Sequence, residues 1–133
     1  MKIATATFFA LAALQAAAPA IAQDAKPMRM IVPFPPGGGN DILGRTVAQH
    51  LAQVRNQQII VDNRGGAGGL IGADLAAHAA PDGHTIFLAS IGNLAFTPAL
   101  QPKLPYDPIK DFAPVTRLAT SAFLMVVNPS VAA

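Results

Sequence analysis

The sequence of 133 residues predicts an α/β fold in which a mostly parallel sheet is flanked by helices. Three short apolar runs, at residues 28–34, 58–62 and 85–89, have the length and the apolar content of buried strands. Between consecutive runs lies a glycine-rich loop followed by a helical pattern. Strand, loop and helix, repeated twice and closed by a third strand, make two βαβ units, and such units place their strands parallel.

The first unit extends to about residue 55. Its strand ends in a loop of two prolines and three glycines at residues 35–39. Beyond the loop, apolar residues recur every three or four positions, which predicts a helix with Ile42, Leu43, Val47, Leu51 and Val54 on one side. We expect Asn40 or Asp41 to cap this helix, because a short polar side chain can accept a hydrogen bond from an unpaired N–H of the first turn.

The second unit has its strand at residues 58–62, a glycine loop at residues 64–69 and a helical pattern from Leu70 to about residue 79. A Pro-Asp-Gly sequence stops that helix, and the third strand follows at residues 85–89. The remaining sequence predicts a short helical turn at residues 93–98, a proline-rich loop at 104–111, and two more strands at 115–118 and 123–127.

Composition excludes several classes of protein. Half of the residues are apolar (52%) and 12% are charged, which excludes a disordered chain, and the absence of cysteine excludes disulfide scaffolds and thiolate metal sites. A net charge of +2 without a basic run gives no reason to expect nucleic acid or an anionic membrane as a partner. His50, His78 and His84 lack the spacing of metal ligands, and glutamate is absent. We therefore expect a binding protein rather than an enzyme, and we expect it to hold neither a cofactor nor a metal.

Residues 1–22 have the pattern of a secretory signal peptide. Lys2 precedes an uncharged, alanine-rich run that ends in Ala20-Ile21-Ala22, with small residues at the positions that signal peptidase reads. Cleavage after Ala22 would leave residues 23–133 in a cell-envelope space such as a periplasm. The alternative is a transmembrane anchor, which the weakly apolar alanines and Pro19 disfavour.

The first glycine loop is a candidate anion site. It lies between a parallel strand and a helix, so its backbone N–H groups and the helix amino terminus can face a bound anion. Ligands of open α/β sheets bind at this carboxyl end of the strands. The alternative is that the glycines only make a tight turn.

The other two loops at this edge offer neutral groups. The second glycine loop lacks the third glycine and the acidic residue of a dinucleotide fingerprint, and no Gly-Lys pair of a phosphate-binding loop exists. Asn63 and Arg64 before it either order the loop or line the cleft, and the alternative for Arg64 is that it faces solvent. After the third strand, Ser90, Gly92 and Asn93 supply neutral donors suited to a carboxylate. A serine hydrolase remains an alternative, but Ser90 would need an activating base, and His84 is too close in sequence to supply one obviously.

Five blocks of the sequence resemble the Bug family, the periplasmic substrate-binding proteins of tripartite tricarboxylate transport systems. They are IVPFPPGG (31–38) with Asp41, VDNR (61–64) with GAGG (66–69) and Ile71-Gly72, PDG (81–83), LPYDP (104–108), and Asp111-Phe112 with Pro114-Val115. The blocks occur in order across nearly all of the mature chain. His84 departs from the family, which usually has an aromatic residue there.

The resemblance implies a periplasmic-binding-protein fold of type II, in which two lobes close on a small carboxylate or dicarboxylate. Carried over to this sequence, the site residues are Phe34, Gly37, Gly38, Asn40 and Asp41 on one wall and Ser90, Gly92 and Asn93 beside it. The implied partners are a small organic acid and the membrane subunits of a transporter, and the full-length protein is expected to be a monomer. Because family members are more than twice as long, residues 23–133 are expected to be the first part of lobe 1, in a partial chain or a non-functional fragment product.

Overall fold

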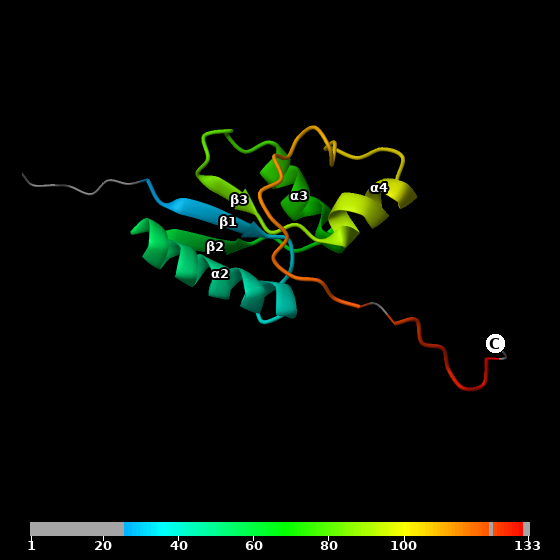
Figure 1. Cartoon of the computed structure of the whole chain (residues 1–133). Helices are drawn as coiled ribbons and strands as arrows, with labels where there is room; N and C mark the ends of the chain where they lie inside the picture. The colour runs from blue at the N-terminus through cyan, green and yellow to red at the C-terminus, as the bar shows by residue number, and fades with distance from the viewer. Residues whose placement is uncertain (1–25, 123, 132–133) are drawn as a thin grey trace, which may run out of the picture.

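The computed structural model describes residues 26–122 and 124–131, and the predicted signal peptide lies outside these ranges. Its centre is a three-stranded parallel sheet of β1 (Met28–Val32), β2 (Ile59–Asn63) and β3 (Thr85–Phe87), in the order β2-β1-β3 (Figure 1). Met30 of β1 is in register with Val61 of β2 and Ile86 of β3. The predicted parallel sheet is therefore confirmed, and each strand begins within one residue of its expected start.

Helices cover the two faces of the sheet, as the βαβ pattern predicts. The long α2 (Gly39–Arg55) lies against one face and the short α3 (Leu70–Ala77) against the opposite face (Figure 1). A single turn of 3-10 helix, η1 (Ala67–Gly69), leads into α3. Within the described ranges, no helix is both long and apolar enough to cross a membrane.

The main core lies between the sheet and α2. Successive residues of a strand point to opposite faces, so Met30 and Val32 of β1 meet Ala48 of α2, and Leu88 joins them from beyond β3. Phe34, Val47, Ile59 and Val61 pack around this buried cluster. The central position of β1 explains its burial, because neighbours flank it on both edges and helices cover both faces.

An aromatic stack closes the α3 face of the sheet at β3. The ring of Phe87 stacks on Phe112 with centroids 5.3 Å apart, and Tyr106 meets Phe112 edge-on at 5.8 Å. The predicted proline-rich loop thus returns to the sheet and fixes the region beyond β3. That region forms η2 (Gly92–Phe96) and α4 (Thr97–Leu100), which confirms the predicted helical turn.

The prediction of strands at 115–118 and 123–127 is wrong for the residues that the structure describes, which exclude Phe123. Residues 115–118 and 124–127 join no sheet, and Val115, Leu124 and Met125 are 90, 87 and 95% exposed. A run of β-branched and apolar residues becomes a strand only where a partner offers its backbone groups. In the described part of the chain no such partner lies beside this segment.

Candidate functional site

The carboxyl ends of the three strands bring three loops together. The N–H of Arg64, after β2, donates to the carbonyl of Val32 in β1 at 2.8 Å, and the N–H of Leu88, after β3, donates to the carbonyl of Ile31 at 2.9 Å. On the α3 side, Gly72 packs directly on Pro33 of the first loop. The loops predicted to carry the site are therefore neighbours in the fold.

The first loop uses Asp41 differently from the predicted cap. The helix begins at Gly39 with Gly38 as its cap residue, and no side chain makes a capping hydrogen bond there. The expectation that Asn40 or Asp41 occupies the cap position is wrong, because the helix starts earlier than its apolar pattern. Asp41 lies in the first turn instead, and its Oδ2 accepts a hydrogen bond from the N–H of Gly37 at 2.8 Å.

Both oxygens of Asp41 are engaged within the protein. Oδ2 also accepts from Nε of Arg45 at 3.0 Å, and Oδ1 accepts from Nδ2 of Asn63 at 2.9 Å. Asn63 in turn donates to the carbonyl of Phe34 at 3.1 Å, so the network ties the first loop to the end of β2. Asp41 is 3% exposed. The hydrogen bonds that it accepts lower its pKa from 3.8 to about 2, and the one from Arg45 has the largest effect, followed by those from Gly37 and Asn63.

This network changes what the first loop can bind. The ionised carboxylate of Asp41 lies at the amino terminus of α2, where an incoming anion would otherwise gain from the helix dipole. Phe34 packs on the core, while Gly37 and Gly38 are exposed and Asn40 is half-buried. Both oxygens of Asp41 thus support the loop, and its place on the wall of a ligand site stays a prediction.

We expect Asp41 to stabilise the fold at neutral pH and to lose this contribution in acid. A folded-state pKa below the ordinary value means that its contribution is complete above 3.8 and declines as the pH falls from 3.8 to about 2. Urea unfolding of the wild type and of Asp41→Asn measures this at several pH values. The variant should be the less stable protein at pH 7, and the difference should shrink below pH 3.8. A difference that stays constant with pH would contradict the assigned role.

The third loop, as we call the segment after β3 that leads into the first turn of η2, holds two buried polar atoms without a hydrogen-bond partner among the described residues. They are Nδ2 of Asn93 and Oγ of Ser90. Asn93 is fully buried and held from both sides: its Oδ1 accepts from the N–H of Ser90 at 2.8 Å, and its carbonyl accepts from the hydroxyl of Tyr106. Unpaired buried donors are rare in folded proteins, and each calls for a ligand, a water or an ion.

The second glycine loop lies opposite the free amide of Asn93. A Cβ atom built on Gly69 would lie 3.0 Å from Nδ2 of Asn93, so the buried amide packs directly against this glycine and leaves no room for a side chain there. Gly66, Gly68 and Gly69 have φ angles of 130°, 67° and 94°, which favour glycine. Directly after Gly69, α3 begins without a side-chain cap. The N–H groups of Gly69 and Leu70 are already bonded within this loop. The unpaired donors beside the start of α3, called the cradle below, are therefore the side chains of Ser90 and Asn93.

Sequence reasoning missed Gly69 and the start of α3 as neighbours of this cradle. The glycine run departs from the nucleotide-binding fingerprints and belongs to the family resemblance, but neither observation marks Gly69 as a neighbour of Asn93. Arg64 does not line the cradle, because its Nε donates to Oδ1 of Asp62 at 2.9 Å on the face of the sheet. The serine-hydrolase alternative requires a base at Ser90, but its Oγ bonds no histidine within residues 26–122. The described ranges also contain no group of three or more potential metal ligands.

Comparison with known proteins identifies similar chains. Residues 43–133 match the family described as "Tripartite tricarboxylate transporter family receptor". Protein BugT of Bordetella pertussis is 41% identical over 92% of this chain and 38% of its own length. Another curated relative, from Pseudomonas sp., is covered over 30% of its length, so the chain spans about a third of these relatives.

Solved structures share the fold as well. MatC of Rhodopseudomonas palustris, solved with bound malate, is 43% identical with a TM-score of 0.64, over 67% of this chain and 30% of that one. Rpa4515 of R. palustris, solved with adipate, is 31% identical with a TM-score of 0.61, over 65% of this chain and 29% of that one. A further neighbour, titled as a periplasmic transporter, is 51% identical with a TM-score of 0.63 over 67% of this chain and 30% of that one.

Proposed function

The chain belongs to the tripartite tricarboxylate transporter receptor family, and on this premise we propose that it captures a small carboxylate or dicarboxylate in the periplasm. The observation that carries the proposal is the pair of buried, unpaired polar atoms, Nδ2 of Asn93 and Oγ of Ser90, at the carboxyl end of the sheet. Both can donate a hydrogen bond to a carboxylate, and a hydrogen bond to a charged group is stronger than one between neutral groups.

Neutral donors suit this ligand class. A carboxylate that binds beside the amino terminus of α3 gains from the helix dipole without an arginine in the cradle. The malate and adipate in the two related structures support the same class of small organic acid. We propose that the wall formed by Gly69, Ser90, Gly92 and Asn93 holds one carboxylate group, and that the first loop, from Phe34 to Asp41, borders it.

The proposed role of residues 23–133 is that of the first part of lobe 1 in a two-lobed receptor. One wall of a cleft leaves a ligand partly hydrated, so the second wall should add contacts and exclude water. A receptor of this family would deliver its ligand to membrane subunits of a transporter, and export to the periplasm would depend on residues 1–22.

The proposal predicts that the chain distinguishes an acid from its amide. Titration of the ¹⁵N-labelled chain with malate should shift the backbone amides of Gly69, Leu70 and Ser90 and the side-chain amide of Asn93. Malamide, which has the same shape without the charge, should produce much smaller shifts, because the donors of the cradle favour an anion.

Two controls make the titration decisive. Sodium chloride at the same ionic strength accounts for nonspecific charge effects. If malate and malamide shift the same amides equally, or if neither shifts the residues around Asn93, the carboxylate site is not in this cradle. That result would favour the alternative hypothesis, that the chain is a non-functional fragment product.

A further inference from the structure

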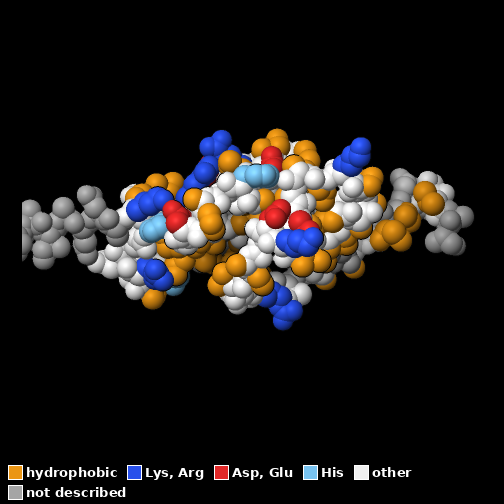
Figure 2. Space-filling model, turned by 90° about the horizontal axis from the view of Figure 1, so that it is seen from above, with side chains coloured by type: hydrophobic (Ala, Val, Ile, Leu, Met, Phe, Trp, Pro, Cys, Tyr) orange, Lys and Arg blue, Asp and Glu red, His pale blue; other side chains and the backbone are white. Residues whose placement is uncertain are grey.

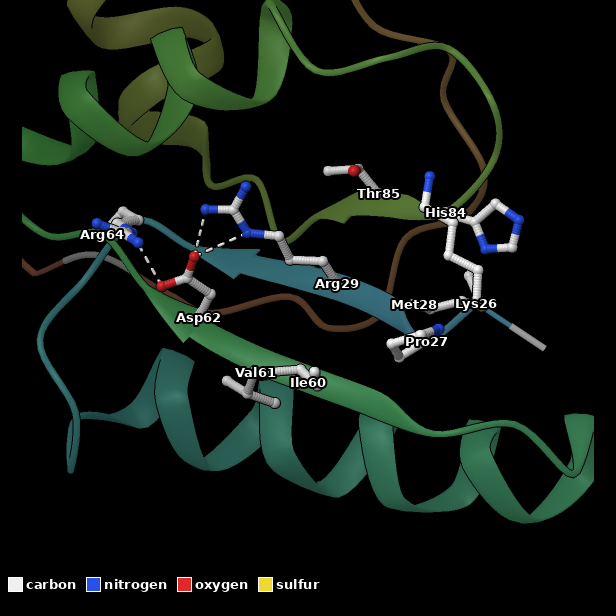
Figure 3. Close-up of a pocket in the computed structure, with 10 residues that line it drawn as sticks. All are labelled: Lys26, Pro27, Met28, Arg29, Ile60, Val61, Asp62, Arg64, His84 and Thr85. Atoms are coloured by element: carbon white, nitrogen blue, oxygen red, sulfur yellow. Dashed lines mark hydrogen bonds and ion pairs between the residues drawn. The ribbon is translucent and has the colours of Figure 1, made fainter. Parts of the chain in front are cut away.

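A hollow lies on the face of the sheet opposite α2, and the residues of the cradle do not line it. It has a volume of about 570 Å³ and extends from Lys26 and His84, at the amino ends of the strands, to Arg64 (Figure 3). Its floor is formed by side chains that the register places on one face, namely Arg29 of β1, Ile60 of β2 and Thr85 of β3. The short α3 lies beside this floor and leaves Ile60 48% exposed.

Two arginines share one carboxylate at the floor of this hollow. Nε of Arg29 donates to Oδ2 of Asp62 at 2.8 Å, its Nη2 bonds the same oxygen, and Nε of Arg64 donates to Oδ1 at 2.9 Å (Figure 3). Both oxygens of Asp62 are therefore engaged, while the side chains of Arg29 and Arg64 are 37 and 51% exposed. The triad has an excess of one positive charge and guanidinium N–H groups directed away from Asp62.

The rest of the hollow does not cancel this charge. Lys26 at its other end is already paired with Asp82 at 2.6 Å, and among the described residues that line the hollow Asp62 is the one acidic side chain. The surface seen from above, on the α3 side, shows basic and acidic side chains next to apolar ones (Figure 2). The hollow thus combines an apolar floor at Ile60 with a fixed pair of donors for one more carboxylate.

A parallel sheet is normally covered by helices on both faces, because its central strands are apolar on both sides. Here α2 runs along the whole sheet on one face, whereas α3 has only 8 residues. The uncovered part is the strip around Arg29 and Ile60. The curated relatives are about three times as long as the matched region, so the family fold contains elements beyond these residues.

We propose that an amphipathic helix with an acidic side chain packs into this hollow, and that the part of the family fold that these residues do not span supplies it. The apolar face of the helix contacts Ile60, and its carboxylate bridges the guanidinium groups of Arg29 and Arg64. This surface reaches the carboxyl end of β2 at Arg64, but Gly69, Ser90 and Asn93 do not line it, so either proposal can fail alone.

The test uses the 133-residue chain and two synthetic helical peptides of identical apolar pattern, one with glutamate and one with glutamine at the position facing the triad. Fluorescence anisotropy should show the glutamate peptide binding roughly tenfold more tightly, as expected for a partly desolvated ion pair. Arg64→Gln should abolish this preference, since Asp62 then neutralises Arg29. Arg55→Gln, at the far end of α2, should keep it.

A charge exchange gives the sharpest outcome. Arg64→Glu should prefer a lysine-bearing peptide, and amide shifts on wild-type binding should map to Ile60 and Thr85. Equal binding of the glutamate and glutamine peptides to the wild type would overturn the proposal, as would shifts confined to the exposed side of α2. Circular dichroism checks that each variant is folded, and the peptide comparison on the wild type does not depend on any variant.

Discussion

Replacing Gly72 by alanine is expected to lower the free energy of unfolding by about 1–3 kcal/mol, the usual range for overpacking a closely packed site. A Cβ on Gly72 would lie 2.7 Å from Cβ of Pro33 and 2.8 Å from the carbonyl oxygen of Arg64. These atoms belong to a proline ring and to the backbone, so no side-chain rotation can relieve the contact. The start of α3 would have to move away from the first loop, and urea unfolding measures the cost.

The control is the same substitution where space is available. Gly39 is the first residue of α2, and a Cβ there would meet no atom within 4 Å. Gly39→Ala should therefore stabilise the chain by about 0.4–1 kcal/mol, because alanine loses less backbone entropy on folding. Equal effects of the two substitutions would show that the contact between Gly72 and Pro33 is not rigid.

The sheet and its helices could be predicted because their signals are local. Apolar runs bounded by glycine and proline predicted β1, β2 and β3, and the spacing of Val47 and Leu51 predicted α2. The segment at residues 115–127 has an equally apolar sequence, yet its described residues form no strand. Composition shows that a segment would suit a sheet, but the hydrogen bonds of a strand depend on a partner that lies elsewhere in the chain.

The location of the site could be predicted, but the partners of its side chains could not. Parallel strands always gather their following loops at one edge, so the neighbourhood of Ser90 and Asn93 with the first loop follows from topology. Whether a carboxylate faces a ligand or the protein is decided by contacts distant in sequence. Asn63 reaches Asp41 across 22 residues, and no pattern near Asp41 reveals that bond.

The same limit applies to Asn93. Its type is consistent with a helix cap, a turn or a ligand contact, and only the fold shows that Oδ1 is used by Ser90 while Nδ2 has no partner in the described chain. The glycines opposite it become informative for the same reason. Gly69 matters because its missing Cβ lets the loop backbone lie directly against the buried amide of Asn93.

Asn93→Asp is expected to abolish the binding of malate, if the proposed cradle is correct. The new side chain keeps an oxygen for the N–H of Ser90 but replaces the free Nδ2 donor by a second oxygen that repels a carboxylate. A lost hydrogen bond to a charged group corresponds to about 1.5–3 kcal/mol, or roughly a 10- to 150-fold weaker affinity before repulsion is added. Titration by amide shifts, as for the wild type, measures the loss.

Two further variants separate this effect from a change in fold or in net charge. Asn56→Asp introduces the same charge at the far end of α2, where Asn56 has a left-handed conformation that aspartate also tolerates, and it should leave malate binding nearly unchanged. Ser90→Ala removes a hydroxyl that bonds no described residue, so it should cost little stability yet still weaken binding. If Ser90→Ala and Asn93→Asp both bind malate like the wild type, the unpaired atoms of the third loop serve another purpose, and the first glycine loop becomes the remaining candidate for the carboxylate.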